Sequence, residues 1–408
     1  MPSLEPLSAL IQQHLHDDVQ QLALQRNRFP HLSDADFRFL LQQVEGYQRT
    51  CDKLPTLSAL PDWWFPVRLS CEQCSSEATA NYKAEIVQSI NLKPSTLDTL
   101  IDLTAGYGID TFHLAALARE AHYVERNADL CRIAEHNFQF YRPNIQVHNT
   151  TAESFLASLP ISDTRYPLPN SEASHTLIYL DPARRSQSGG KVFCIEDCEP
   201  NVIELLPTLR TYAERIMIKF SPMLDITAAL RMLGTDWDTH IVAVNNEVKE
   251  VLFLTGQGII HAVNIRTREM RTDRFCFRPE DEKQAPLRLA PAIEQYIYEP
   301  NAAIIKAGAF RLIGERYGLQ KLDTNTHLYT SATLLPDFPG RIWQVVEDIK
   351  EPKKQLDKSA RYSILSRNYP LSPEEIRKKY KLRDGDEQYL IAARHKGKPL
   401  LIGAKRMK

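Results

Sequence analysis

The stretch Thr99–Asp110, TLIDLTAGYGID, decides the fold of this chain. It begins with a short apolar run, which is typical of a buried parallel strand. Gly106 and Gly108 then allow a tight turn and a close approach of the backbone to a ligand. Asp110 opens an apolar-periodic segment, so we expect a helix whose free N–H groups point back at the turn. The stretch therefore predicts a strand, a ligand-binding turn and a helix in succession.

An acidic residue follows at the end of the next expected strand. Glu125 lies about 20 residues beyond the turn, where a carboxylate can accept hydrogen bonds from both ribose hydroxyls of a nucleotide-like ligand. The third glycine of G-x-G-x-x-G would fall at Thr111, so the fingerprint of a dinucleotide is incomplete. Asp102 precedes the turn, where it would repel a pyrophosphate but suit an ammonium or a sulfonium. These features favour S-adenosylmethionine (SAM) as cofactor over NAD.

A third motif closes the strand His175–Leu180 with Asp181-Pro182. Pro182 fixes its own φ and pushes Asp181 toward extended geometry, so a carboxylate and rigid carbonyls face the crevice of the sheet. A nucleophilic amine needs such acceptors, because they hold its N–H groups and aim its lone pair at the methyl carbon. Asp-Pro by itself would indicate an ordinary turn, but its position one strand beyond the other two motifs favours a site for a nucleophilic amine.

With these motifs in place, residues 96–254 resemble a class I SAM-dependent methyltransferase. DLTAGYGID is similar to the first motif of that family, VERNADL to its ribose-binding motif, and YLDPAR to its fourth motif. The resemblance implies an α/β, Rossmann-like sheet whose last two strands form an antiparallel hairpin. The expected strands are Thr99–Leu103, His122–Glu125, Ile145–Asn149, His175–Leu180, Glu214–Phe220, Ile241–Asn245 and Val248–Leu254, with helices such as Asp129–Phe140 and Leu224–Leu233 between them.

The resemblance also implies which residues form the site. The cofactor-binding positions are Asp102, Thr104, Ala105, Gly106, Gly108, Asp110, Glu125, Ala152 and Glu153. The catalytic positions are Asp181, Pro182 and Arg184, and no metal is implied. Ala152-Glu153 matches the place where family members contact the adenine, although the usual Asp is missing.

The fourth motif departs from the family pattern. Amino-methylating members often have a second proline and an aromatic after Asp-Pro, whereas this chain has Ala183 and Arg184. An arginine plane can stack on a base or hold a phosphate, and it can equally be a surface charge. The turn beginning at Thr104, Thr-Ala-Gly-x-Gly-x-Asp, is similar to that of small bacterial ribosomal RNA guanine-N2 methyltransferases, which favours an exocyclic amine as target.

The whole chain resembles a bacterial group of methyltransferases with a C-terminal THUMP-like domain. The segments Ser75–Ala84, Glu299–Phe310 and Ser366–Leu382 carry this likeness. We expect a helical N-terminal region over residues 1–90 and the methyltransferase domain over 91–285. A helical linker over 286–339 and a small α+β, ferredoxin-like domain over 340–408 complete the expected organisation.

Local patterns support the expected ends of the chain. In the linker, Leu289–Tyr298 and Ala302–Tyr317 have helical spacing. In the tail, we expect the strands Arg341–Val346 and Tyr362–Ser366, and a hairpin of Gln388–Arg394 and Pro399–Ala404. Ser372-Pro373-Glu374-Glu375 predicts a helix start with a capping box.

Charge is distributed unevenly along the chain. Residues 340–408 contain 18 Lys+Arg and 9 Asp+Glu, whereas residues 1–339 contain 32 and 42. A basic tail on a methyltransferase suggests a polyanion, and RNA (tRNA or rRNA) is the natural candidate. The alternative is a solvated basic surface that packs on the acidic body. Nothing indicates DNA specifically.

Composition limits the remaining possibilities. There is no apolar run long enough to span a bilayer and no signal-peptide core, so we expect no membrane partner and a cytoplasmic protein. The seven cysteines are expected to be free thiols. Cys71 and Cys74 have zinc-knuckle spacing, and Cys194 and Cys198 could add ligands, but buried or idle thiols are the preferred interpretation.

Three further segments have two interpretations each. Lys83 could reach the cofactor, but a solvated lysine is the preferred interpretation. Trp63-Trp64-Phe65 is expected to form core or domain interface rather than a base-stacking platform. Gln187–Lys191 is a candidate loop that closes over substrate, because its glycines allow large backbone changes, or a plain connector.

The sequence thus predicts a SAM-dependent methyltransferase that modifies a base in structured RNA. The first alternative is a methyltransferase for a protein or a small molecule. The second is a non-catalytic RNA-binding protein that keeps a SAM-like fold, and a nicotinamide oxidoreductase is more distant. The oligomeric state is not fixed by the sequence.

Overall fold

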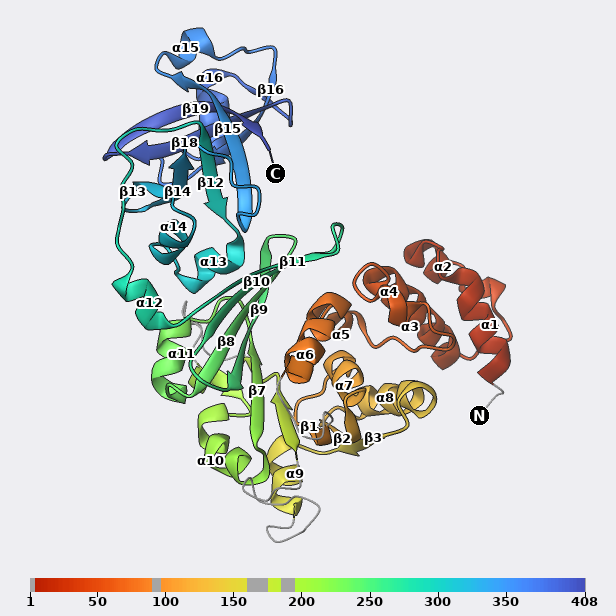
Figure 1. The fold of residues 1–408 in the computed structure, drawn as a ribbon. Helices are drawn as coiled ribbons and strands as arrows, with labels where there is room; N and C mark the ends of the chain where they lie inside the picture. Colours follow the sequence, from red (N-terminus) through yellow and green to blue (C-terminus); the bar gives the residue numbers. More distant parts are fainter. Residues whose placement is uncertain (1–3, 90–96, 160–174, 185–194, 408) are drawn as a thin grey trace. The chain divides into compact units, whose positions relative to one another are not determined.

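The computed structural model describes residues 4–89, 97–159, 175–184 and 195–407 (Figure 1). The chain forms two compact units. The first unit contains Met1–Trp237 and Val251–Thr255, and the second contains Asp238–Glu250 and Gly256–Lys408. The expected loop Gln187–Lys191 and Cys194 lie outside the described residues.

The N-terminal part of the first unit is helical, as predicted. Its helices are α1 Leu4–His14, α2 Val19–Leu24, α3 Asp34–Thr50, α4 Pro55–Ser58, α5 Arg68–Gln73 and α6 Glu77–Ser89, with a 3-10 turn at Arg26–Arg28. Ser33 caps α3 by accepting from the backbone N–H of Asp36. Phe29, Phe37 and Leu40 form part of the apolar cluster that joins the first three helices.

The sheet of the first unit has the strand order β9-β7-β4-β1-β2-β3. Its strands are β1 Leu97–Asp102, β2 Ala118–Glu125, β3 Ile145–Asn149, β4 Thr176–Leu180, β7 Arg215–Phe220 and β9 Glu247–Thr255. The strands from β7 to β3 are parallel, and β9 pairs antiparallel with β7. Because parallel strands end at one edge, the ends of β1, β2 and β4 meet there.

Helices connect these parallel strands, as the βαβ pattern requires. They are α7 Ile109–Ala115, α8 Ala128–Tyr141, α9 Ala152–Ser158, α10 Val202–Tyr212 and α11 Ile226–Leu233. A short antiparallel ribbon follows β4: β5 Ala183–Arg184 pairs with β6 Cys198–Glu199, after a 3-10 turn at Ile195–Asp197. This arrangement of sheet and helices confirms the predicted Rossmann-like fold.

The second unit contains strands in the order β11-β10-β8-β9. Here β8 is Trp237–Val244, β10 is Ile260–Arg266 and β11 is Arg271–Phe277, followed by α12 Pro279–Gln284. Asn245 and Asn246 both have positive φ in the two-residue connection between β8 and β9. Such a turn is typical of a tight hairpin, so the predicted final hairpin is confirmed.

An eight-stranded sheet forms the rest of the second unit, in the order β13-β14-β12-β15-β19-β18-β16-β17. Its strands are β12 Tyr296–Pro300, β13 Gln320–Asp323, β14 Thr326–Ser331, β15 Gly340–Ile349, β16 Arg361–Ser366, β17 Arg383–Asp384, β18 Gln388–His395 and β19 Lys398–Arg406. Its helices are α13 Ala302–Ala307, α14 Leu312–Arg316, α15 Pro352–Gln355 and α16 Pro373–Tyr380.

The prediction of a helical linker over residues 286–339 was wrong. Tyr296–Pro300 is a strand that pairs on both sides, with β14 and with β15, so the segment belongs to the sheet. The helix expected over Ala302–Tyr317 is interrupted at Gly308, which adopts a left-handed conformation that ends α13. Because β12 pairs with β15, residues 296–339 and the tail form one sheet rather than a linker and an appendage.

The prediction for the tail was correct in its elements. Ser372 caps α16, and the side chain of Glu375 accepts from the Ser372 N–H, which completes the predicted capping box. The hairpin of β18 and β19 closes at Lys396-Gly397, where both residues have positive φ. These signals are local, which is why the sequence alone was sufficient to find them.

Candidate active site

The glycine turn lies where β1 ends and α7 begins. Gly108 has φ of +85°, and an added Cβ would lie 2.6 Å from the ring of Phe138, so only glycine fits. Gly106 has φ of +57°, and its added Cβ would meet only the Thr104 carbonyl at 4.0 Å. The space beside Gly106 is therefore open, as a turn that cradles a ligand requires.

Glu125 ends β2 directly beside this turn. Its Oε2 accepts from the backbone N–H of Gly106 at 3.0 Å, and its Oε1 accepts from that of Asn127 at 2.8 Å. The end of β3 is tied to the same place, since the Asn149 side chain donates to the Glu125 carbonyl at 3.0 Å. Ala152 and Glu153 follow in the first turn of α9. The structure thus brings Glu125 to the glycine turn and the end of β3 to Glu125.

Asp102 lies behind the turn and is closed to solvent. Its Oδ2 accepts from the Thr111 hydroxyl at 2.5 Å, and its Oδ1 accepts from the backbone N–H of Thr104 at 3.1 Å. Burial raises the pKa of the Asp102 carboxyl to about 8, against an ordinary value of 3.8. A positive charge placed nearby would favour the ionised form of this carboxyl.

Asp110 is the centre of a buried polar cluster. Its Oδ1 lies 3.1 Å from the Lys83 ammonium, and its Oδ2 accepts from the hydroxyls of Ser75 and Tyr179, each at 2.7 Å. Burial by itself raises the pKa of the Asp110 carboxyl, but the positive charges of Lys83 and Lys219 outweigh it, and the pKa falls to about 2. Asp110 therefore joins the N-terminal helices to α7 and β4.

Lys83 corrects one expectation from the sequence. Its side chain is fully buried, so the interpretation of a solvated lysine was wrong. Lys83 lies in α6, where Tyr82 and Ile86 are buried as well, and its ammonium reaches Asp110 of α7. The sequence shows that Lys83 has apolar neighbours, but the helical periodicity does not show that Asp110 is its partner.

The N-terminal region also fixes the glycine turn through aromatic residues. The Tyr107 hydroxyl accepts from the Trp63 indole N–H at 2.7 Å and donates to the Trp64 carbonyl at 3.1 Å. Asn137 of α8 exchanges two hydrogen bonds with the Trp64 backbone, at 2.8 and 3.0 Å. Trp63 and Phe65 are buried, which confirms that this segment forms core.

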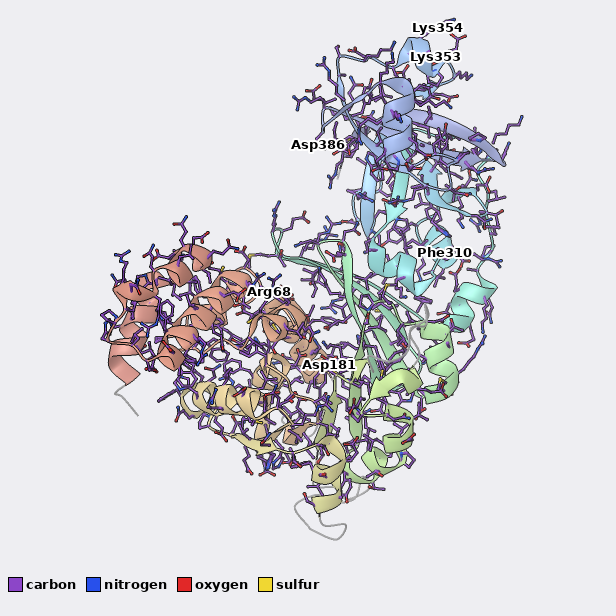
Figure 2. The ribbon with its side chains drawn as sticks, turned by 180° about the vertical axis from the view of Figure 1, so that it is seen from behind. Arg68, Asp181, Phe310, Lys353, Lys354 and Asp386 are labelled. Carbon is purple, nitrogen blue, oxygen red and sulfur yellow. The ribbon has the colours of Figure 1, made fainter. Side chains whose placement is uncertain are left out.

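Asp181 lies at the end of β4 on the same edge of the sheet, and Figure 2 labels it. Its backbone N–H donates to the Thr104 hydroxyl at 2.6 Å, which joins the fourth motif directly to the glycine turn. Its Oδ2 lies 2.5 Å from the Lys219 ammonium of β7. Pro182 is buried, and the next two residues enter the β5–β6 ribbon, where Arg184 pairs with Cys198.

The cysteines do not form a metal site in the part of the chain that is described. No group of three or more His, Cys, Asp or Glu side chains that could hold a metal occurs among those residues. Cys71 is buried, and burial raises the pKa of its thiol to about 12. Its Sγ contacts the Pro66 carbonyl, and the Sγ of Cys74 contacts the Cys71 carbonyl, as expected of thiols packed against backbone.

Comparisons with known proteins agree with this geometry. Residues 72–188 match a family described as "Putative SAM-dependent methyltransferase". Residues 296–339 match a ferredoxin-like domain, and residues 340–406 match a THUMP-like domain. The ferredoxin-like match therefore falls on the segment that was predicted to be a linker. The sequence analysis had expected the ferredoxin-like domain over residues 340–408.

Individual relatives give the same result. A crystal structure of a "putative methyltransferase" from Porphyromonas gingivalis W83 has 30% sequence identity and a TM-score of 0.83, and the match covers 99% of this chain and 98% of that one. Two Mycobacterium tuberculosis proteins, from strains CDC 1551 / Oshkosh and H37Rv, are 25% identical over 246 residues. Both are named as uncharacterized S-adenosylmethionine-dependent methyltransferases, and the match spans 58% of this chain and 64% of their length.

The sheet, the glycine turn and these relatives define the class: this is a class I methyltransferase fold. The chain belongs to the family of SAM-dependent methyltransferases that carry a C-terminal THUMP-like domain. SAM is the cofactor of that family, and the residues present fit it. The open space at Gly106 leaves room for a ligand at the turn. Glu125 is an acid that suits the ribose, and the buried carboxyl of Asp102 suits the positive charge.

Proposed function

We propose that this chain transfers a methyl group from SAM to a base in structured RNA, at an exocyclic nitrogen. The observation that carries the proposal is the hydrogen bond from the Asp181 backbone to the Thr104 hydroxyl. It supports Asp181 as the acceptor for an amine, because it joins the fourth motif to the turn that would hold the cofactor. Positioning of this kind supplies much of the rate when the transferred group is already activated.

The proposed cofactor contacts divide into two kinds. Gly106, Gly108 and Glu125, with Ala152 and Glu153, would touch the cofactor, because they line the turn and the neighbouring strand ends. Asp102 and Asp110 are both buried, whereas Glu125 is only partly buried. Asp102 would therefore act through its charge, and Asp110 by joining α7 to the N-terminal helices. When bound, SAM supplies a methyl group on a positively charged sulfur.

The target amine would be held by the fourth motif. The carboxylate of Asp181 can accept an N–H from the amine, and the backbone fixed at Pro182 keeps that acceptor in place. Arg184 is proposed to contact the base or a phosphate next to it. An amine that accepts a methyl group must also lose a proton, which passes to solvent or to Asp181.

RNA as the substrate is supported by the second unit. Residues 340–408 carry an excess of nine positive charges. The THUMP-like match covers residues 340–406, which is almost the whole of this segment. Lys353 and Lys354 lie exposed on α15, as Figure 2 shows, and Lys396 and Lys398 lie exposed at the tip of the β18–β19 hairpin. Exposed cations bind phosphates and release counterions, so RNA affinity would fall steeply with salt.

The test has two stages. Calorimetry would measure the affinity for SAM of the wild type and of Gly106→Val, whose branched side chain would occupy the open space and disfavour the positive φ. SAM carrying a tritiated methyl group would then be supplied with RNA from cells that lack the gene. SAM binding that Gly106→Val abolishes, together with labelled RNA, supports the proposal.

Other outcomes lead to different functions. SAM binding with labelled protein, or with no labelled RNA, favours a methyltransferase for a protein or a small molecule. No SAM binding by the wild type leaves an RNA-binding scaffold. Among the described residues, no helix is long and apolar enough to cross a membrane. A substrate among cellular RNAs would place the protein in the cytoplasm.

A further inference from the structure

Lys219 is a cation near the end of a strand whose middle is apolar. It is the second-to-last residue of β7, whose residues Ile216, Met217 and Ile218 are fully buried. The strand pairs in parallel with β4, and Ile218 faces Leu180 in the register. The side chain of Lys219 is only 13% exposed. A lysine at such a place costs free energy unless its ammonium has partners, so its position needs an explanation.

The partner that the geometry provides is the acid of the fourth motif. The Lys219 ammonium lies 2.5 Å from Oδ2 of Asp181, whose side chain is 39% exposed. The main chain of Asp181 is fixed separately, by the Thr104 hydroxyl at 2.6 Å. The same positive charge lowers the pKa of Asp110, so Lys219 acts on two carboxylates at this edge of the sheet.

This arrangement leaves Asp181 half open. One carboxylate oxygen contacts Lys219, and the exposed fraction of the side chain leaves room for a further donor on the other. A carboxylate held at its backbone and at one oxygen has little rotational freedom, so its free oxygen points in a defined direction. This is the condition under which an acceptor can orient an incoming N–H group.

We propose that Lys219 is a positioning residue for methyl transfer: it holds Oδ2 of Asp181 so that the second oxygen accepts the N–H of the target amine. The inference rests on the proposed function, because it assumes that Asp181 receives an amine. It adds a residue from a strand that carries none of the sequence motifs. Lys219 itself touches neither the amine nor the cofactor in this proposal.

The experiment compares Lys219→Met, Lys219→Arg and Asp181→Asn, each alone, and Lys219→Met in the Asp181→Asn background. Lys249→Met is the matched control, since Lys249 pairs with Glu247 at the surface with 44% of its side chain exposed. The measurements are kcat and KM for labelling of RNA from cells that lack the gene, the Kd for SAM, and the unfolding midpoint. The Kd for SAM and the midpoint report whether a variant is folded.

The expected result for Lys219→Met is a fall in kcat of about 10- to 100-fold, with the KM for RNA and the Kd for SAM within about twofold of the wild type. Lys219→Arg should recover most of the lost kcat, because a guanidinium can also hold the carboxylate. In the Asp181→Asn background, removing Lys219 should have little further effect. Lys249→Met should behave like the wild type.

Two results would overturn the inference. A higher KM for RNA with unchanged kcat would mean that Lys219 binds RNA directly. If Lys219→Met lowers kcat by the same factor in the wild type and in the Asp181→Asn background, Lys219 and Asp181 act independently. If Lys219→Met does not fold, Lys219→Gln, which removes the charge but keeps a polar side chain, takes its place, and a folded Lys219→Gln with the kcat of the wild type would overturn the inference. A wild type that labels no RNA would refute the proposed function instead.

Discussion

The ion pairs Lys83–Asp110 and Lys219–Asp181 both belong to the first unit, and they differ in exposure. Lys83 and Asp110 are 0% and 9% exposed, whereas Lys219 and Asp181 are 13% and 39% exposed. In the closed pair, two hydroxyls complete the coordination of the carboxylate. In the open pair, the carboxylate keeps an exposed side. The difference indicates that the first pair holds the structure together, while the second can exchange partners with a substrate.

The largest effect is expected from breaking the closed pair. Lys83→Met leaves the Asp110 carboxylate buried without the ammonium that contacts it, so the free energy of unfolding should fall by about 3–5 kcal/mol. Urea denaturation would show a lower midpoint with an unchanged slope. The double variant Lys83→Met/Asp110→Asn, which removes both charges, should recover part of the loss. A loss below about 1 kcal/mol for Lys83→Met would show that this pair is not the structural one.

The open pair should respond in activity rather than in stability. Asp181→Asn keeps the shape of the side chain but removes its charge, and we expect methyl transfer to fall by about 100-fold. The Kd for SAM, measured by calorimetry, should stay within about threefold of the wild type, because Glu125 and the glycine turn are untouched. An equal loss of SAM binding and transfer would contradict the assigned position of Asp181.

A smaller effect is expected from pH, through the third carboxyl at this edge. The pKa of Asp102 is about 8 in the folded chain and ordinarily 3.8, so between these values the folded state carries a proton that the unfolded state has lost. The contribution of Asp102 to stability is therefore greatest below about pH 4 and decreases as pH rises toward 8.

The same shift predicts how SAM binding depends on pH. A bound cation favours the ionised form of Asp102, so binding below pH 8 should release a proton. Affinity should then rise with pH by at most about tenfold per unit and level off above pH 8. Calorimetry in buffers of different ionisation enthalpy would count the released protons. Asp102→Asn should remove this release, and a release that persists would assign it to another group.

The smallest effect should come from a lysine–carboxylate pair at the surface. Lys249 and Glu247 lie 2.7 Å apart with 44% and 74% of their side chains exposed. Exposed pairs of this kind contribute little, so Lys249→Met should change the free energy of unfolding by less than about 0.5 kcal/mol. Thermal unfolding of Lys249→Met and Lys83→Met under the same conditions would then show how much more stability is lost when the ion pair that is broken is buried.

The motifs of the cofactor site could be predicted because they are local. Gly108 needs a positive φ, and its place before an apolar-periodic helix is visible in the sequence. Glu125 ends an apolar strand at the expected distance, and its contact with Gly106 follows from the parallel register of β1 and β2. Each of these signals depends on residues within one turn or one strand.

The expectations that failed concern burial and pairing at long range. The apolar side chains in residues 296–300 are compatible with a strand or a helix. The segment forms a strand because it pairs with β14 and β15. Lys83 was expected at the surface because the sequence does not show that Asp110 lies opposite it. Lys219 was not considered at all, since the sequence of its strand does not indicate which acid its ammonium would meet.

The sequence by itself determined the order of the parallel strands in the first unit, the glycine turn and the acids that end or follow β1, β2 and β4. It did so because backbone conformation and hydrophobic periodicity are set by neighbouring residues. Only the tertiary structure decided which lysine meets which carboxylate, and how much water each pair keeps. Those properties depend on side chains that are far apart in the chain, and the energy of an ion pair depends on burial that only the packed fold creates.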